Sequence, residues 1–424
     1  MTIVPASVLR TLALLRARLT PELARARLSR RDGDRPARLR AGRAASAETI
    51  DALWAQMKKA GADVSGRDAL ADARARADAS LYASNIENMI GLARLPVGVV
   101  GPLRINGLNA CGDYFAPLAT TEAALVASYA RGAAVVTAAG GVSTAMLGEG
   151  VLRTPGFRFR SLAEAGVFVD WVAREVQTLR AAAEATTRHG KLISLEPVID
   201  NDVVFLMCRY TTGDASGQNM VTIATEAMCR HIVEICPDKP LAWYVEANFS
   251  GDKKASYLGV LTGRGRKVSA SAILAGPLVK TMLGVDVEDM LAYGEMANLG
   301  ALLSGQIGAQ AHYANALAAF YIATGQDAAC VAESAVGFTR MERRSEDLFV
   351  SVTLPNILVG TVGGGTDLPT QTAALSLLGL KGPGRAAALA EVVAALCLCG
   401  EISIVAALAA GHFTRAHAKL ARMR

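Results

Sequence analysis

The stretch 191–211, KLISLEPVIDNDVVFLMCRYT, decides the expected fold because two strand-like runs meet at a tight polar turn. The runs Lys191–Ile199 and Val203–Thr211 contain β-branched and aromatic residues, and the triplet Asp200-Asn201-Asp202 separates them. A short polar turn between two such runs is typical of a β-hairpin.

The segments on either side of this hairpin extend the pattern. Periodicity predicts a strand over Phe157–Arg160 and a helix over Ser161–Ala185 before it, then a helix over Gln218–Cys236 and a strand over Leu241–Val245 after it. The order βαββαβ is that of a ferredoxin-like domain, in which two helices cover one face of a four-stranded antiparallel sheet. We therefore expect residues 156–245 to form such a domain, inserted into a larger one.

The rest of the sequence predicts a large helix-rich domain around this insertion. Residues 1–84 alternate Arg-rich helical segments with breaks, which indicates a small helical N-terminal region, and residues 85–155 and 246–424 form the large domain. The stretch Asn298–Gln326 is uncharged and long enough to suggest a membrane span, but it contains too many polar residues to face lipid. We therefore expect it to be the long, buried central helix of the large domain. The predicted fold class is α+β.

Composition favours a cytoplasmic globular protein that binds neither metal, membrane nor nucleic acid. Of 424 residues 52% are hydrophobic, and much of the net charge of +6 comes from arginines near the two ends. An aromatic content of 5% argues against an aromatic-lined nucleic-acid groove. The seven cysteines are odd in number and lack metal-binding spacing, so we expect reduced thiols. Leucines among the first arginines predict a docked helical arm, with disorder or a membrane-surface role as the alternative.

Four ionisable residues are candidates for chemistry, and each also has an ordinary structural interpretation. Glu122 begins a helical pattern over residues 120–138, where it is either a capping residue or a partly buried general acid. Lys253 lies in a charged turn and is either solvated or placed to stabilise an oxyanion. Asp327 follows a long apolar stretch and requires a partner, most naturally a lysine. His417, in the C-terminal tail, is by default a surface histidine.

Two glycine-bearing segments are candidates for binding a nucleotide. Residues 360–366, GTVGGGT, permit close backbone approach but lack the Gly-Lys-Ser/Thr ending of a P-loop, and no GxGxxG follows a strand. Residues 212–220, TGDASGQNM, carry a turn into the start of a predicted helix, whose free N–H groups can receive a pyrophosphate. We expect the second segment to be the better anion site.

Six short motifs occur together along the chain. They are Glu87-Asn88 with PVGVVGPL at 96–103, ATTE at 119–122, DKK at 252–254, GQD at 325–327, the loop at 360–366 and AAGH at 409–412. With these motifs in this order, residues 85–417 resemble the 3-hydroxy-3-methylglutaryl-coenzyme A (HMG-CoA) reductases of the soluble prokaryotic type. A chance agreement of six motifs is negligible.

The resemblance implies an enzyme that uses NADPH, and no metal, to reduce HMG-CoA through mevaldehyde to mevalonate and CoA, in the pathway to isoprenoids. Lys253 would stabilise the oxyanions, Glu122 would protonate the aldehyde oxygen, and Asp327 would couple to both. His417 would protonate the departing CoA thiolate. The resemblance also implies a homodimer, or a higher oligomer built of dimers, whose active sites lie between subunits.

Binding residues follow from the same resemblance. The implied substrate contacts are Glu87, Asn88, Arg153 near the substrate carboxylate, and Asn248 and Asn315 beside the lysine. The implied cofactor contacts are Asp214, Ser216, Gly217, Asn219, Gly363 and Gly364. Arg188 stands where members that prefer a 2′-phosphate carry a Ser-Arg pair, which favours NADPH over NADH. Lys253 is preferred to Lys254 because neighbours on an extended strand point to opposite faces and the motif selects the first.

Several positions depart from the resemblance. Ser216 and Gln218 stand at methionine positions, Glu246 replaces a small polar residue near the substrate, and Ala297 replaces a lysine that contacts CoA. These departures leave open a paralogue that reduces a different branched acyl-CoA. A non-catalytic protein that binds CoA thioesters is the other alternative. The complete set of four catalytic candidates argues against it, because a binding protein has no need of all four.

Overall fold

The computed structural model describes residues 20–30, 38–40 and 45–411, together with residues 6, 8–10, 13 and 33. The chain divides into two compact units, residues 1–92 and 93–424. His417 lies outside the described residues, as does most of the leucine- and arginine-rich segment at the N-terminus.

The described part of the N-terminal unit contains short helices. They are α2 (Pro21–Leu28), α3 (Ala47–Lys59), α4 (Arg67–Leu70), α5 (Ala73–Ala77) and the 3-10 helix η1 (Ala79–Tyr82). Ile50 and Trp54 on α3 are buried in a small apolar core, and the Trp54 indole donates a hydrogen bond of 2.8 Å to the carbonyl of Ile90. Glu87 and Asn88 belong to this unit and are exposed.

The larger unit combines one mixed sheet with helices, which confirms a mixed α and β fold. Its strands are β1 (Val97–Gly107), β2 (Cys111–Ala119), β3 (Val142–Arg153), β4 (Gly156–Arg158), β5 (Lys191–Asp200), β6 (Val203–Thr211), β7 (Ala242–Tyr244), β8 (Gly265–Leu274), β9 (Phe338–Arg344) and β10 (Asp347–Ile357). Its helices are α6 (Leu125–Ala138), α7 (Leu162–Glu184), α8 (Gln218–Ile235), α9 (Tyr257–Thr262), α10 (Gly276–Leu283), α11 (Val287–Ser304), α12 (Tyr313–Thr324), η2 (Ala328–Cys330), α13 (Val331–Ser334), η3 (Gly364–Asp367), α14 (Pro369–Leu377) and α15 (Ala386–Ala409).

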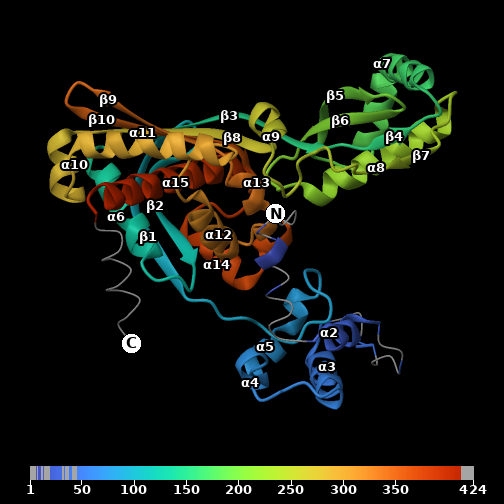
Figure 1. The fold of residues 1–424 in the computed structure, drawn as a ribbon, viewed down its shortest axis with the longest axis horizontal. Helices are drawn as coiled ribbons and strands as arrows, with labels where there is room; N and C mark the ends of the chain where they lie inside the picture. The colour runs from blue at the N-terminus through green and yellow to red at the C-terminus, as the bar shows by residue number, and fades with distance from the viewer. Residues whose placement is uncertain are drawn as a thin grey trace. The chain divides into compact units, whose positions relative to one another are not determined.

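Strand β3 joins the two halves of the sheet. Its residues 143–150 pair with β8, and its last three residues, 151–153, pair with β6. Beyond this point the elements from β4 to β7 occur in the order βαββαβ, and their antiparallel strands lie side by side as β7-β4-β6-β5. This green segment occupies one end of the larger unit, with β3 leading into it (Figure 1). The end of β3 is therefore the point where the two halves meet.

The long buried helix of this unit is α15, and the expectation for Asn298–Gln326 was wrong. That stretch divides into α11 and α12, because Gly305 ends α11 with a left-handed φ of 73° and Gly308 follows with a φ of 89°. By length and composition α15 could cross a membrane, but 78% of its most apolar window is buried inside the unit. Buried core helices of soluble proteins can be equally long and apolar.

Two glutamates on α15 are almost completely inaccessible to solvent and bind the surrounding loops. Glu391 accepts hydrogen bonds from the backbone N–H groups of Asn109, Ala110 and Met146, at 2.9 to 3.1 Å. Glu401 accepts from the N–H groups of residues 311 and 312, both at 2.9 Å. Buried carboxylates are tolerated when such donors surround them. The helix therefore fixes the loops that precede α12 and follow β1.

Helices α6 and α15 approach each other at glycines. A Cβ atom added to Gly132 would lie 2.0 Å from the carbonyl oxygen of Cys399, and one added to Gly400 would lie 2.2 Å from the ring of Tyr129. Neither position has room for a side chain. The close contact depends on the absence of a Cβ atom at both.

We predict that Gly132→Ala destabilises the protein by about 2 kcal/mol or more, because overpacking a dense core forces the two helices apart. Gly166→Ala on α7 is the matched control, since a Cβ there meets nothing within 4 Å. It should leave stability unchanged or raise it by up to about 1 kcal/mol through helix propensity. Urea unfolding of both variants measures the difference, and similar midpoints would contradict the close packing described for Gly132.

Candidate functional site

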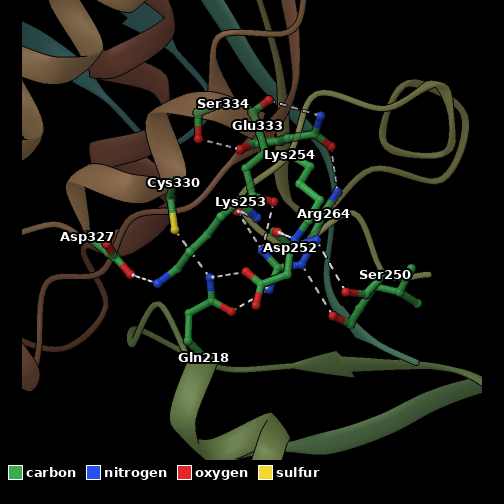
Figure 2. A network of polar contacts seen from close by, with 12 residues as sticks. Gln218, Ser250, Asp252, Lys253, Lys254, Arg264, Asp327, Cys330, Glu333 and Ser334 are labelled. Carbon is green, nitrogen blue, oxygen red and sulfur yellow. Dashed lines mark hydrogen bonds and ion pairs between the residues drawn. The ribbon is translucent and has the colours of Figure 1, made fainter. Parts of the chain in front are cut away.

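A cluster of charged side chains lies where β3 ends and β8 begins. Lys253 and Asp327, both singled out from the sequence, form an ion pair of 2.8 Å between Nζ and Oδ2. Figure 2 shows the pair beside Asp252, Arg264 and Glu333. The predicted lysine partner of Asp327 is therefore Lys253. Lys254 instead directs its ammonium to the carbonyl oxygen of Asp252.

Lys253 occupies a strained turn and not the extended strand that the alternation argument assumed. Its φ is 57°, and Asn248 and Gly251 in the same loop are also left-handed, at 62° and 73°. A left-handed lysine costs about 1–2 kcal/mol, so the surroundings must hold it. The carboxylate of Glu333 does so by accepting the N–H of Lys253 at 3.2 Å. The side chain is thereby directed toward Asp327.

The ion pair keeps Lys253 charged. The hydrogen bond from its ammonium to Asp327 raises the pKa of Lys253, and partial burial opposes this only in part. An ammonium whose charged form is favoured in this way is suited to stabilising an oxyanion.

Arg264 is the buried centre of the cluster, with 1% of its surface exposed. Its Nη1 lies 2.7 Å from both oxygens of Glu333, and its Nη2 lies 3.0 Å from Asp252 Oδ1. Burial raises the pKa of Glu333, and the attraction of Arg264 offsets this only partly. For Asp252 burial also acts to raise the pKa, but Arg264 and then Arg153 outweigh it and lower the value.

Gln218 connects the first turn of α8 to this cluster. Its amide oxygen accepts from Arg264, and its amide nitrogen donates to Asp252 at 3.4 Å and to the Cys330 thiol at 3.3 Å. Sequence reasoning identified Gln218 only as a departure and did not single out Arg264 or Glu333. Glu333 offered a weak signal as the one charged residue in the run 328–336, whereas Arg264 lies in the glycine- and base-rich stretch 263–267 and offered none.

Arg153, the last residue of β3, also joins the cluster. It is 6% exposed, and its Nη1 donates to Glu246 at 3.0 Å and to Asp252 at 3.1 Å. Asn248 is exposed in the loop between Glu246 and Asp252. The structure thus brings Arg153 together with Lys253 and Asp327.

Glu122 and Asn315 lie in a different place, a cavity of about 800 Å³ between α6, α11, α12 and α15. Helix α6 begins only at Leu125, after a left-handed Ala124 with φ of 70°, so Glu122 precedes the helix and is exposed, not partly buried as expected. Ala297 lines the same cavity. Among residues 45–411, no hydrogen bond or ion pair links Glu122 to Lys253 or Asp327.

The two glycine-bearing segments lie side by side. The Thr361 N–H donates to the carbonyl of Asp214 at 2.8 Å, and a Cβ on Gly360 would lie 2.6 Å from the backbone nitrogen of Ser216. Gly217 caps α8 with a left-handed φ of 76°, and Asn219 lies in the first turn. Space is open around the glycines of the second loop, Gly363 and Gly364.

The carboxylate of Asp214 is occupied by backbone donors. It accepts the N–H groups of Gly384, Arg385 and Ala386 at 2.7 to 3.1 Å. Partial burial would raise the pKa of Asp214, but these three N–H groups lower it. Asp214 thus anchors the turn that leads into α8.

Arg188 is exposed in a loop beside α8. Its neighbour Thr187 contacts the sulfur of Met220 at 3.0 Å, which places the loop next to the first turn of the helix. Across residues 45–411 no group of three or more His, Cys, Asp or Glu side chains is arranged to hold a metal ion.

Comparisons with known proteins agree on one family. The sequence profile described as hydroxymethylglutaryl-coenzyme A reductase matches residues 56–422. The chain is 44% identical over 348 residues to 3-hydroxy-3-methylglutaryl-coenzyme A reductase of Aeropyrum pernix, covering 81% of this chain and 83% of the relative. It is 42% identical over 340 residues to the Methanothermobacter thermautotrophicus enzyme of the same name, covering 80% and 85%.

A solved structure has the same fold. The class II 3-hydroxy-3-methylglutaryl-CoA reductase from Streptococcus pneumoniae, bound to NADPH in open conformations, aligns with a TM-score of 0.62 and 19% identity. The alignment covers 85% of this chain and 96% of that one.

We predict that Asp327→Asn lowers the pKa of Lys253, because it removes the acceptor that chiefly raises it. The pH dependence of acetylation at individual lysines, followed by mass spectrometry, measures this value. Asp286→Asn is the control, since it removes the partner of Lys280 at 2.5 Å and should leave Lys253 unchanged. Equal titration of Lys253 with and without Asp327 would show that the ion pair does not set its charge.

Proposed function

Since the chain belongs to the hydroxymethylglutaryl-coenzyme A reductase family of oxidoreductases, we propose that it reduces HMG-CoA to mevalonate and CoA with NADPH, through mevaldehyde. The observation that carries the proposal is the Lys253–Asp327 ion pair, held at the rim of a buried charged cluster. Mevalonate made in this way would enter isoprenoid synthesis in the cytoplasm.

Different residues of this chain would carry out the separate steps of the reaction. Two NADPH molecules, bound in succession, would each supply one hydride, so negative charge would develop once on the thioester oxygen and once on the aldehyde oxygen. The ammonium of Lys253 stabilises both, because Asp327 keeps it protonated. Glu122 protonates the aldehyde oxygen, and His417 protonates the CoA thiolate as it leaves.

The segment from β4 to β7, residues 156–245, serves in this proposal as a ferredoxin-like cofactor domain inserted between residues 85–155 and 246–424. Ser216, Gly217 and Asn219 surround the N-terminus of α8, where free N–H groups suit a pyrophosphate. The open backbone at Gly363 and Gly364 lies beside this turn and completes the cofactor site. Residues 1–84 form the helical N-terminal region, and Glu87 and Asn88 contact the substrate.

A homodimer would bring the separated candidates together. On α11 four apolar side chains are exposed: Met296 at 73%, Leu299 at 55%, Leu302 at 77% and Leu303 at 78%. A row of this kind is unfavourable in water and suits an interface with a second copy. Glu122 and Asn315 lie in the cavity that α11 borders, so a partner packed on this helix can complete the site with them.

The test is cofactor oxidation by the purified protein with HMG-CoA and, separately, with mevaldehyde. We predict that Lys253→Ala lowers kcat for both substrates by about 10²–10³-fold or more, the usual loss for one oxyanion donor. Lys254→Ala is the matched control and should change kcat by less than about tenfold, because its ammonium binds a backbone carbonyl. A larger loss with Lys254→Ala would assign the oxyanion role to the wrong lysine.

Cofactor choice provides a separate prediction. Arg188 is exposed beside α8, and a guanidinium binds a 2′-phosphate with two hydrogen bonds. We expect the unaltered protein to prefer NADPH, and Arg188→Ala to reduce the NADPH:NADH ratio of kcat/KM by about 10–100-fold, the loss of a hydrogen bond to a charged group. Equal efficiency with both cofactors before mutation would rule out this role for Arg188.

A further inference from the structure

One short segment of the chain holds Lys253 at both of its ends. The lysine ammonium pairs with Asp327 at 2.8 Å, and the lysine backbone N–H donates to the carboxylate of Glu333 at 3.2 Å. Asp327 caps the 3-10 helix η2, and Glu333 lies on α13, which follows η2 directly (Figure 2). The separation of the two attachment points is therefore set within a single stretch of helix.

The turn that carries Lys253 leaves the N–H of this residue unused. The turn is closed by the N–H of Lys254, which donates to the carbonyl of Gly251 at 3.1 Å, so Lys253 is the third of its four residues. A φ of 57° at that position is typical of a type II turn, in which glycine is favoured. The N–H of Lys253 binds Glu333 instead. A charged acceptor makes a strong hydrogen bond, which offsets the strain of a left-handed lysine.

Glu333 is itself fixed in the core. It is 1% exposed, and both of its oxygens lie 2.7 Å from Arg264 Nη1. The next residue, Ser334, is fully buried and donates its hydroxyl to the carbonyl of Asn356 at 2.7 Å. The backbone of the half-exposed Lys253 is thus bound to the buried frame of the protein.

We propose that Glu333 is a positioning residue that determines where the Lys253 ammonium stands during reduction. It fixes the lysine backbone from the same segment that carries Asp327. The proposal rests on the reduction proposed above and adds a residue that acts through Lys253, not on the reacting atoms. An oxyanion donor is effective when it is held in place before the charge develops, and a displacement of about 1 Å can cost about 10²-fold in rate.

The position of the Glu333 carboxylate can be changed without changing its charge. Glu333→Asp keeps the negative charge that neutralises Arg264 but shortens the side chain by one methylene, which withdraws the acceptor from the Lys253 N–H. Glu391→Asp on α15 is the matched control, because Glu391 is also fully buried and also accepts backbone N–H groups, but in the loops after β1 and in β3. Both variants shorten a buried carboxylate, and only the first alters the support of Lys253.

Acetylation of Lys253, followed by mass spectrometry, reports on its contact with Asp327 without any turnover. Loss of this contact leaves the amine more often neutral, so Glu333→Asp should speed acetylation at neutral pH by about 3–10-fold. Asp327→Asn should have the same effect, and the double variant should match Asp327→Asn alone, because Glu333 acts only through that contact. Additive effects in the double variant, or an equal effect of Glu391→Asp, overturn the assignment.

Cofactor oxidation provides the second measurement. Glu333→Asp should lower kcat with HMG-CoA and with mevaldehyde by about 10–100-fold while KM changes by less than about threefold, because a displaced lysine chiefly weakens stabilisation of the transition state. Glu391→Asp should leave both constants within about twofold of the unaltered protein. A rise in KM at unchanged kcat in Glu333→Asp would contradict a positioning role.

Glu333→Gln provides the same test if the aspartate variant does not fold. One of its two terminal atoms becomes a donor, which faces either Arg264 or the Lys253 N–H, so the same changes are expected. If neither variant folds, Glu333 is a structural residue and the assignment fails. If the acetylation pattern holds but the unaltered protein reduces neither HMG-CoA nor mevaldehyde, the proposed function fails and the positioning of Lys253 by Glu333 stands.

Discussion

Burial of α15 is the constraint on which the larger unit depends. The helix has 24 residues, and nearly all from Ala386 to Ala406 are inaccessible to solvent. Its apolar surface must be covered on every side, which places α6, α12 and the strands β8 and β10 around it. The two buried glutamates then bind backbone N–H groups in fixed loops, so the same helix that forms the core also sets the loop before α12.

The polar cluster follows a second requirement, that a fully buried guanidinium be neutralised where it lies. Arg264 is held by Glu333 and Asp252, and these carboxylates in turn fix the backbone of Lys253 and the side chain of Arg153. Removing one partner of such a network usually costs about 3–5 kcal/mol because the other charge is left buried and unpaired. Stability and orientation of the site thus depend on the same contacts.

Local pattern was sufficient for much of the architecture. The hairpin around Asn201 and the helices α7 and α8 follow from periodicity and turn chemistry, and their observed bounds differ from the expected ones by a residue or two. The stretch from Asn298 to Gln326 was misassigned because an uncharged run gives no sign that Gly305 ends one helix and Gly308 redirects the chain. In the same way, apolar residues after Glu122 suggested a helix that in fact begins at Leu125.

The candidate site, like the fold, could be predicted from the sequence only in part. The pairing of Lys253 with Asp327 could be anticipated because a lone acid after an apolar helix needs a cation. The roles of Arg264, Glu333 and Gln218 could not, since they depend on tertiary contacts between positions far apart in the sequence. The separation of Glu122 from Lys253 within one chain was also beyond reach, because the order of motifs along a sequence carries no information about the distances between them.

The two ion pairs of the site differ in exposure and should therefore respond differently to salt. Lys253 and Asp327 keep 43% and 40% of their side-chain surface in solvent, whereas Arg264 and Glu333 keep 2% and 1%. Dissolved ions screen exposed charges over about 8 Å at physiological salt and reach buried ones far less. Rising salt concentration therefore weakens the attraction that orients the lysine ammonium while the buried framework beneath it persists, so concentrated electrolyte can alter the chemistry of this site without unfolding the protein around it.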